Sequence, residues 1–327
     1  MRSTVLAILL ACAAASLADS RVASSQPAGA RIDATTRVLA WNVSSDAFTR
    51  EPAAFRALLA RADADVLLLD EVAPATTEAQ LRTVLAGRRR EASGDWRVSI
   101  GRSGGRQRGV IATRLPLDPV PELSGLVPYP DAERSRLQGL MTAAEENFPG
   151  FGMDGGVPVN GAIVTTGGKR LLVVVLDLQC CGPTPASWQE ERRRVETRAI
   201  RHRIVQVLAR TPVDGMIVAG DMNLVNTPVP MVILSGPYAA PHAGLIAADL
   251  LHLDGAENWT WDGRDTPFPS RPMDFILYSP HALALREGYV LDSADLGQPE
   301  LDRLGLTRDA AIGLSRHLPL VTEFAWR

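Results

Sequence analysis

Cysteine is scarce in this chain of 327 residues. It has three cysteines, Cys12, Cys180 and Cys181. The last two are adjacent, and neighbouring cysteines close only a strained ring, so a framework of disulfides is excluded. We expect this pair to be buried thiols beneath a site, with a redox-active or soft-metal thiol pair as the alternative.

The chain also lacks an excess of positive charge, since its formal net charge is −3 at pH 7. Binding to long duplex nucleic acid normally relies on a surface rich in lysine and arginine, so the overall charge argues mildly against it. Arginines gather only locally, at residues 88–90 and 102–108. Such runs are most often solvated loops or helix ends, but they also offer contacts for a phosphate.

The N-terminal apolar run, residues 5–15, is too short to span a bilayer as a stable anchor. It follows Arg2 and precedes small residues, so residues 1–18 are predicted to be a signal peptide. Alternatively, a lipoprotein signal ends before Cys12 and leaves that cysteine acylated. Both alternatives predict export, to the periplasm or as a secreted protein, with membrane attachment only if Cys12 is lipidated.

Linkers and internal repeats are absent from the rest of the sequence. The polar residues 19–36 are predicted to be a disordered leader, and residues 37–327 a single domain. That length suits one large α/β domain or two small ones, and no stretch rich in glycine, serine and proline divides it.

Apolar runs that alternate with helical periodicity predict the order of the elements. Strands are expected at residues 38–43, 65–70, 96–100, 109–113, 162–166, 170–178, 216–219, 275–278 and 320–324. Helices are expected at 49–62 (capped by Thr49, with Pro52 in the first turn), at 77–87 (with a Thr77/Gln80 capping box) and at 185–210. Residues 119–159 are predicted to be a long loop or lid. Strands alternate with helices in the first part of the chain and pairs of strands follow, which favours an α/β fold.

Five short polar segments begin or end these predicted strands. They are Ala40-Trp41-Asn42, Asp70-Glu71-Val72, Gly220-Asp221-Met222-Asn223, Arg271-Pro272-Met273-Asp274 and Ser315-Arg316-His317-Leu318-Pro319. A charge at the end of a buried strand must face a ligand, a partner or water. Carboxylate and amide oxygens are the ligands that Mg²⁺ and Mn²⁺ prefer, so the set suits a divalent cation beside a phosphate.

In this order the segments resemble the endonuclease/exonuclease/phosphatase superfamily of metal-dependent phosphoesterases. The resemblance spans residues 37–327 and implies a four-layer sandwich of two stacked mixed β-sheets flanked by helices. It also implies a Mg²⁺ or Mn²⁺ cofactor. Glu71 would be the principal metal ligand, and Asn42 a metal or phosphate contact. Asp177 stands where many members carry a phosphate-binding histidine, and an aspartate there favours a metal.

The resemblance also assigns catalytic roles. Asp221 would orient or activate the attacking water, and Asn223 would hold the phosphate. His317 would be the base or the contact to the phosphate in the transition state. Asp274 would hydrogen-bond the imidazole of His317 and fix its tautomer, since a carboxylate behind a histidine raises its basicity.

One position departs from the family pattern, because Ser315-Arg316-His317 replaces the usual Ser-Asp-His. A guanidinium cannot bind a cation and would repel one if it pointed inward. Arg316 either turns outward, or points inward and holds the substrate phosphate, or marks a protein that has lost catalysis and only binds a phosphorylated ligand. Arg108 is a further candidate contact, on the rim of a basic groove.

We therefore expect an exported metal-dependent phosphoesterase that hydrolyses a phosphodiester or phosphomonoester by in-line attack of activated water. Its substrate would be a small molecule, a lipid head group or a nucleic acid, and no obligate protein partner is inferred. The alternatives are an exported nuclease of the same fold and a non-catalytic phospholigand-binding protein.

Overall fold

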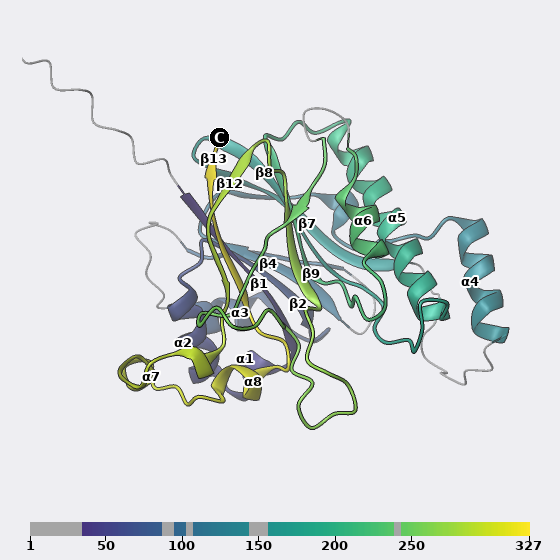
Figure 1. Cartoon of the computed structure of the whole chain (residues 1–327). Helices are drawn as coiled ribbons and strands as arrows, with labels where there is room; N and C mark the ends of the chain where they lie inside the picture. Colours follow the sequence, from purple (N-terminus) through teal and green to yellow (C-terminus); the bar gives the residue numbers. More distant parts are fainter. Residues whose placement is uncertain (1–34, 87–94, 103–106, 144–155, 239–242) are drawn as a thin grey trace, which may run out of the picture. The chain divides into compact units, whose positions relative to one another are not determined.

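The computed structural model describes residues 35–86, 95–102, 107–143, 156–238 and 243–327. Two β-sheets dominate these residues (Figure 1). The six-stranded sheet has the order β12 (Leu283–Val290), β13 (Leu320–Trp326), β1 (Thr35–Ser45), β2 (Val66–Val72), β4 (Arg108–Thr113) and β3 (Arg97–Ile100). The seven-stranded sheet has the order β10 (Ile246–Ala247), β11 (Asp274–Tyr278), β9 (Gly215–Asp221), β8 (Lys169–Asp177), β7 (Val157–Thr166) and β5 (Leu117–Pro119), and β6 (Leu126–Val127) pairs with β7.

Both sheets are mixed and carry helices on their outer faces. β1 and β2 run parallel, as do β8 and β9, and the other neighbours are antiparallel. The six-stranded sheet is accompanied by α1 (Ala47–Arg50), α2 (Pro52–Ala62), α3 (Glu78–Leu85), α7 (Gln298–Leu304) and α8 (Ala310–Leu314). The seven-stranded sheet is accompanied by α4 (Asp131–Ala143), α5 (Trp188–Leu208) and α6 (Val229–Ser235). This confirms the predicted sandwich of two mixed sheets flanked by helices.

Side-chain alternation along β8 explains why the sheets are buried on both sides. Val173 and Val175 pack into a core shared with the six-stranded sheet, whereas Leu172 and Val174 pack against α5. Successive residues of a strand point to opposite faces, so a strand buried on both faces reads as a continuous apolar run. Continuing the alternation places Asp177 on the face that meets the other sheet.

Cap and turn residues lie at the ends of several helices and strands. The capping box of Thr77 and Gln80 begins α3. β7 and β8 correspond to the strands expected at 162–166 and 170–178. They form a hairpin around Gly167 and Gly168, whose φ values of 59° and 76° are those of a tight turn that favours glycine. α5 begins at Trp188, three residues after the expected start, where the Ser187 side chain accepts a hydrogen bond from the Glu190 amide.

Several segments differ from the predictions. Thr49 lies inside α1 and does not cap a helix, because Pro52 begins a separate helix, α2, whose N-cap is Glu51. β1 begins at Thr35, inside the predicted leader, because Thr35 and Thr36 pair with the C-terminal strand β13. The predicted loop at 119–159 contains η1 (Pro121–Leu123), β6 and the thirteen-residue helix α4.

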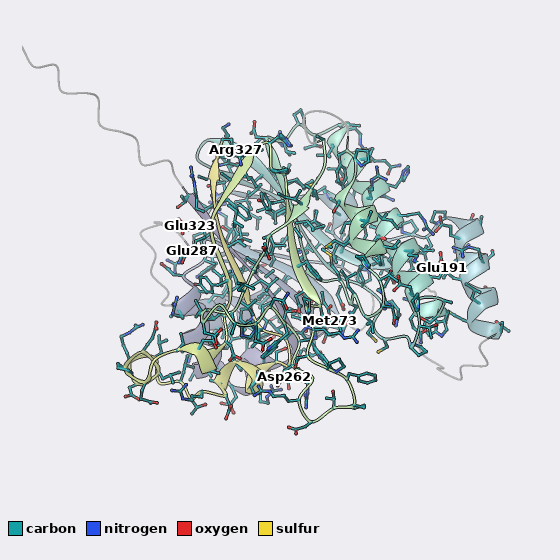
Figure 2. The ribbon with its side chains drawn as sticks, in the orientation of Figure 1. Glu191, Asp262, Met273, Glu287, Glu323 and Arg327 are labelled. Carbon is teal, nitrogen blue, oxygen red and sulfur yellow. The ribbon has the colours of Figure 1, made fainter. Side chains whose placement is uncertain are left out.

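Some sequence predictions lie outside the described residues. These are the signal peptide with Cys12, the leader up to residue 34, and the arginines at 88–90 and 106. Within the described residues, no helix is long and apolar enough to cross a membrane. Figure 2 shows the side chains of this part of the chain, including Glu287 and Glu323, which face each other across β12 and β13 and both pair with Arg37.

Candidate active site

Strand register brings five polar side chains to one edge of the two sheets. Asn42 and Asp70 are partners across the parallel strands β1 and β2. Asp221 is the partner of Asp177 on β8 and of Asp274 on β11. Asn42 Nδ2 donates to Asp221 Oδ2 at 3.4 Å, a contact that joins one sheet to the other. The strand ends therefore face each other across the space between the sheets.

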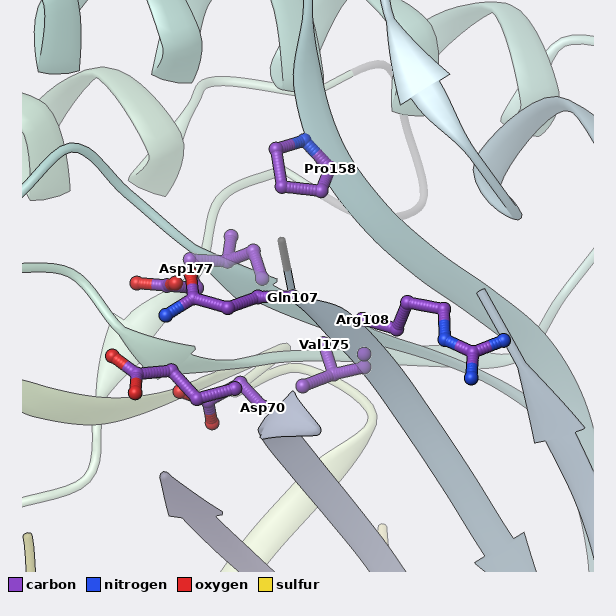
Figure 3. Close-up of a pocket in the computed structure, with 9 residues that line it drawn as sticks. Asp70, Gln107, Arg108, Pro158, Val175 and Asp177 are labelled. Carbon is purple, nitrogen blue, oxygen red and sulfur yellow. The ribbon is translucent and has the colours of Figure 1, made fainter. Parts of the chain in front are cut away.

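A bulge in β2 adds a sixth group, Glu71. The pairing of β2 with both of its neighbours shifts between Leu69 and Val72, and Glu71 has a φ of 53°. Adjacent strand residues normally point to opposite faces, but a bulge re-aims one of them. As a result Asp70 and Glu71 line the same cleft, together with Asp177 (Figure 3).

Three of these carboxylates can share a cation. Glu71, Asp177 and Asp221 each offer an oxygen, and these oxygens all lie within 4.8 Å of one another. Oxygen ligands bind Mg²⁺ or Ca²⁺ at about 2.0–2.6 Å, so a single ion can bridge oxygens at such separations. Burial, and then the neighbouring carboxylates, raise the pKa of Asp177. The cluster thus concentrates negative charge that a cation or protons must balance.

The buried carboxylate of Asp70 independently favours a cation in this cluster. It is 1% exposed, and neither carboxylate oxygen has a hydrogen-bond partner among the described residues. Burial raises its pKa well above 3.8, and Asp177, Asp274 and Asp221 raise it further. A buried carboxylate without donors is costly, so the residues present fit a divalent cation and its water.

His317 lies between two aspartates on the other side of Asp221. Its Nδ1 is 2.9 Å from Asp274 Oδ2 and its Nε2 is 3.7 Å from Asp221 Oδ2. Thr260 Oγ1 donates to the same Asp274 oxygen at 2.6 Å. Burial lowers the pKa of His317, but the Asp274 and Asp221 carboxylates outweigh it and bring the pKa to about 10. The imidazole is therefore held as a cation at neutral pH when no metal is bound.

The backbone around His317 is fixed from two sides. Trp41 Nε1 donates to the His317 carbonyl at 2.8 Å, and the Trp41 ring stacks on Phe55 of α2. Ser315 Oγ donates to the Asn42 carbonyl at 2.8 Å and accepts from the His317 amide at 3.1 Å. The serine of this segment thus ties His317 to the end of β1.

Asp221 and Asn223 form a tight turn at the end of β9. The Asn223 amide donates to Asp221 Oδ1 at 2.8 Å, and Asn223 Nδ2 donates to the Leu178 carbonyl at 2.9 Å. Burial raises the pKa of Asp221 to about 8, with the His317 charge acting in the opposite direction. Gly220, with a φ of 129°, is required because a Cβ there would lie 2.0 Å from the Leu176 carbonyl oxygen.

Arg316 points away from the acidic cluster. Its side chain is exposed, and Nη1 donates to the carbonyl oxygens of Asp262 at 3.1 Å and of Arg264 at 2.9 Å. These bonds hold the guanidinium on the loop before β11. In the structure Arg316 is turned outward, as in the first of the alternatives. The guanidinium does not point into the site, where it would have to lie to hold the substrate phosphate.

Arg108 also has a different environment from the one expected. Its Nη2 donates to the Thr76 carbonyl at 2.6 Å and to the carbonyls of Ala73 and Pro74. In Figure 3 the guanidinium is directed away from Asp70 and Asp177. Arg108 lines the cleft with its stem and stabilises the loop after β2, so we do not count it as a phosphate contact.

Sequence reasoning placed Glu71, Asn42, Asp177, Asp221, Asn223, Asp274 and His317 in one site, and the structure brings them together. It missed Asp70 and Thr260. Asp70 belongs to the Asp70-Glu71-Val72 segment, but regular strand alternation would point Asp70 and Glu71 to opposite faces of the sheet. The bulge in β2 brings both side chains to the same cleft. Thr260 lies in an irregular segment and has no motif that could have revealed it.

The fold is an α/β sandwich, and its clustered carboxylates offer ligands for a divalent cation. The chain belongs to the endonuclease/exonuclease/phosphatase family, whose model matches residues 39–297. Members of this family hydrolyse phosphoester bonds with a divalent metal, and the chain is a hydrolase of that kind. The match ends before Ser315, so the placement of His317 rests on the structure.

Solved structures with the same fold are distant in sequence. An endonuclease/exonuclease/phosphatase from Bacteroides vulgatus has a TM-score of 0.57 and 12% identity, over 90% of this chain and 99% of that chain. The human Nocturnin catalytic domain with bound sulfate has a TM-score of 0.51 and 17% identity, over 90% and 95%. TDP2 from D. rerio, complexed with a single-stranded DNA product, has a TM-score of 0.52 and 16% identity, over 89% and 99%. No curated protein matches the chain.

Proposed function

We propose that this protein is an exported phosphoesterase that uses Mg²⁺ or Mn²⁺ to hydrolyse a phosphodiester or phosphomonoester. One observation carries the proposal. The three-carboxylate cluster of Glu71, Asp177 and Asp221 shares Asp221 with the cluster of Asp221, Asp274 and His317. A cation site and an acid–base pair therefore meet at one residue.

Glu71 and Asp177 would hold the cation, with Asn42 beside them at the end of β1. When bound, the cation would supply Lewis-acid stabilisation of the negative charge on a phosphoryl oxygen. Both acids are only partly exposed, whereas Asp221 is buried. The cation would therefore be reached through Glu71 and Asp177, with the buried Asp221 as the third carboxylate of the cluster.

Asp221 and His317 would have different roles in the proton transfer. Asp221, buried at the end of β9 and close to both the cation ligands and His317, is suited to take a proton from the attacking water. Against the effect of burial, the carboxylates of Asp274 and Asp221 raise the pKa of His317, so its imidazole would donate a hydrogen bond to the transferring phosphoryl group. Asp274 and Thr260 keep the imidazole in place, and Asn223 lies beside Asp221 to contact the phosphate.

The non-catalytic alternative loses part of its support. It rested on the loss of a metal ligand at Arg316 and on the repulsion of a cation by the guanidinium. Only the repulsion is relieved, because Arg316 is exposed and bonded to backbone carbonyls. A nuclease remains the enzymatic alternative, since a structural neighbour was solved with a DNA product. The expected basic groove lacks Arg108, whose guanidinium binds the 73–76 loop. We therefore favour a small phosphoester or a lipid head group over a long nucleic acid.

A panel of phosphoesters tests the proposed function. Purified protein would be assayed with Mg²⁺, Mn²⁺ or EDTA on aryl phosphomonoesters and phosphodiesters, a phosphocholine lipid, and single-stranded DNA. Glu71→Gln is the site variant, and Glu78→Gln, on the exposed side of α3, is the matched control. We expect metal-dependent turnover of at least one substrate, lost in EDTA and in Glu71→Gln alone. Full turnover in EDTA would contradict the proposal.

Export is a separate part of the proposal and rests on the pattern of residues 1–18. Expression with the native N-terminus in a bacterial host, followed by mass measurement of the protein in each cell fraction, tests it. Cleavage after Ala18 supports a secreted or periplasmic protein, whereas a lipid mass on Cys12 supports an anchored one. An uncleaved protein in the cytoplasm would refute export.

A further inference from the structure

The adjacent thiols of Cys180 and Cys181 are a feature that hydrolysis does not use. They lie in the loop that follows β8, shortly after Asp177. The two Sγ atoms are 2.8 Å apart and share a hydrogen bond. Both cysteines are free, Cys181 is exposed and Cys180 is partly exposed. This corrects the expectation of buried thiols and leaves a nucleophilic pair open to solution.

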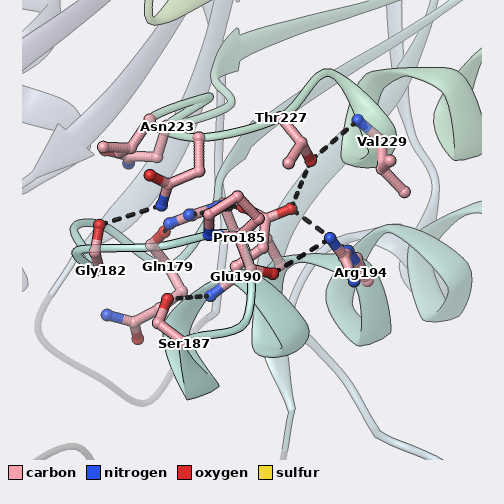
Figure 4. A network of polar contacts seen from close by, with 12 residues as sticks. Gln179, Gly182, Pro185, Ser187, Glu190, Arg194, Asn223, Thr227 and Val229 are labelled. Atoms are coloured by element: carbon pink, nitrogen blue, oxygen red, sulfur yellow. Dashed lines mark hydrogen bonds and ion pairs between the residues drawn. The ribbon is translucent and has the colours of Figure 1, made fainter.

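A buried arginine fixes the backbone on both sides of Cys180. Arg193 is 0% exposed, and its Nη1 donates to the carbonyls of Gln179 at 2.7 Å and of Cys181 at 2.8 Å. The Arg193 charge is balanced by Glu190 at 2.7 Å, also 0% exposed. Figure 4 shows Glu190 within the polar network that joins α5 to this loop. The thiols are therefore held close together by a loop that is tied to the start of α5.

The same loop supports the candidate active site. The Leu178 carbonyl accepts the hydrogen bond from Asn223 Nδ2, and the Leu178 amide donates to the Asp221 carbonyl at 3.0 Å. Gly182, directly after the thiol pair, accepts from Asn226 Nδ2 at 3.0 Å. A change in the backbone conformation at Cys180 would therefore reach the hydrogen bond between Leu178 and Asn223 across only two residues of the chain.

The two thiols differ in reactivity. The hydrogen bond with Cys180 lowers the pKa of Cys181 to about 7, burial opposes this shift, and Arg193 supports it. The same hydrogen bond, and then burial, raise the pKa of Cys180. The thiolate is the nucleophile in disulfide exchange, and a thiol whose pKa is near the ambient pH attacks most effectively. Cys181 is thus suited to attack first.

We propose that Cys180 and Cys181 form a thiol–disulfide exchange site for small-molecule disulfides. The Cys181 thiolate attacks one sulfur of the disulfide, forms a mixed disulfide and releases one thiolate. Cys180 then attacks the Cys181 sulfur, closes a bond between the two cysteines and releases the second thiolate. The two protein thiols are oxidised, the small disulfide is reduced to two thiols, and the two cysteine protons pass to the leaving thiolates.

Ring closure must distort the loop. Cα atoms of adjacent residues are about 3.8 Å apart across a trans peptide, whereas disulfides normally join Cα atoms about 4.4–6.8 Å apart. The distortion strains the carbonyls that Arg193 holds and, next to them along the loop, the Leu178 carbonyl that accepts from Asn223. A strained disulfide is also easily reduced, so the closure is reversible. The effect on turnover rests on the proposed function, but the exchange itself does not.

Peptide mapping tests the exchange directly. The full chain would be incubated with oxidised glutathione, quenched with N-ethylmaleimide and digested with trypsin. Residues 171–192 form one tryptic peptide with both cysteines, and Cys12 lies in a separate peptide, residues 3–21. We expect the 171–192 peptide to lose two hydrogen atoms and take up no maleimide, and dithiothreitol to restore both thiols.

Single variants separate the two roles. Cys180→Ser should stop at the glutathione adduct on Cys181. Cys181→Ser should react roughly tenfold more slowly, because Cys180 is less exposed and burial raises the pKa of its thiol. Wild-type protein that keeps both thiols free while Cys180→Ser becomes glutathionylated would overturn the proposal. So would wild-type protein that ends as a stable mixed disulfide.

Turnover and thermal stability test the connection to the site. Oxidised wild type should have a lower Tm and at least roughly tenfold lower phosphoester turnover, while Cys180→Ser/Cys181→Ser should keep its basal activity in oxidant. A closed disulfide with unchanged turnover would refute the path through Leu178. If the protein hydrolyses no phosphoester, the peptide map still decides whether the exchange occurs.

Discussion

Arg316 Nη1 donates a 3.1 Å hydrogen bond to the carbonyl oxygen of Asp262, and this contact holds the guanidinium outside the acidic cluster. The sequence alone left open whether Arg316 abolishes cation binding, contacts the substrate or does neither. With the side chain exposed and bonded to backbone, its charge lies in water, where electrostatic interactions are weak. The site keeps its three-carboxylate cluster beside this arginine.

Arg316→Ala should therefore leave catalysis almost unchanged. We expect kcat and KM within about twofold of wild type and a stability loss of roughly 0.5 kcal/mol or less, as for most exposed positions. Steady-state kinetics and a denaturant titration would measure both. Arg264→Ala, which removes the exposed partner of Asp262, is the matched control. A tenfold rise in KM for Arg316→Ala alone would show that Arg316 contacts the substrate.

His317→Ala and Asp221→Asn should each reduce kcat far more than Asp274→Asn. Removing a positioned acid or base costs on the order of 10² to 10⁴-fold. Asp274→Asn removes neither reacting group and keeps a side chain of the same shape that can hydrogen-bond the imidazole of His317. Single-turnover rates at saturating substrate would rank the three variants. Equal and small losses at all three positions would place the chemistry elsewhere.

Asp70→Asn should have opposite effects on stability and on cation binding. Removing a buried carboxylate that lacks partners should raise the Tm of the cation-free protein by roughly 2 °C or more. The same change should weaken Mn²⁺ binding about tenfold, the usual scale for groups that orient a metal's ligands or waters. Thermal unfolding with and without Mn²⁺ measures both effects. A variant that binds Mn²⁺ as tightly as wild type would remove Asp70 from the site.

The cation-free protein should lose stability as the pH rises. Burial raises the pKa of Asp221 from 3.8 to about 8, and neighbouring aspartates raise that of His317 from 6.5 to about 10 against the effect of burial. Each folded-state pKa exceeds its unfolded value, so the folded state binds more protons. The stabilisation is complete below the unfolded pKa and is lost as the pH rises through the folded pKa.

Divalent cations should reverse this trend, because they bind deprotonated ligands. The Tm difference between cation-loaded and EDTA-treated protein should thus increase from about pH 5 to about pH 8. In Asp221→Asn this increase with pH should be smaller. Thermal scans across that range provide the measurement. A Tm difference that does not change with pH would contradict the assigned ionisations.

Patterns that repeat along the chain allowed most of the fold to be predicted. Continuous apolar runs such as 66–69 mark strands buried on both faces, and turn or cap residues such as Gly167 and Thr77 fix the ends of elements. α4 was missed because only one of its residues, Leu137, is buried, so its sequence carries almost no apolar periodicity.

The candidate site was predictable wherever a side chain follows the regular alternation of its strand. Asp177, Asp221 and Asp274 do so, and they meet because of strand register. Glu71 joins them only because a bulge re-aims it to the same cleft as its neighbour Asp70. The positions of Arg108 and Arg316 depend on loop carbonyls brought close by tertiary folding, which no local pattern encodes.

A calorimetric titration with Mn²⁺ tests most directly whether Glu71, Asp177 and Asp221 hold a divalent cation. We predict saturable binding to wild type, at least roughly tenfold weaker binding to Glu71→Gln and to Asp177→Asn, and unchanged binding to the exposed control Glu78→Gln. Wild-type binding that persists undiminished in both Glu71→Gln and Asp177→Asn would contradict the account.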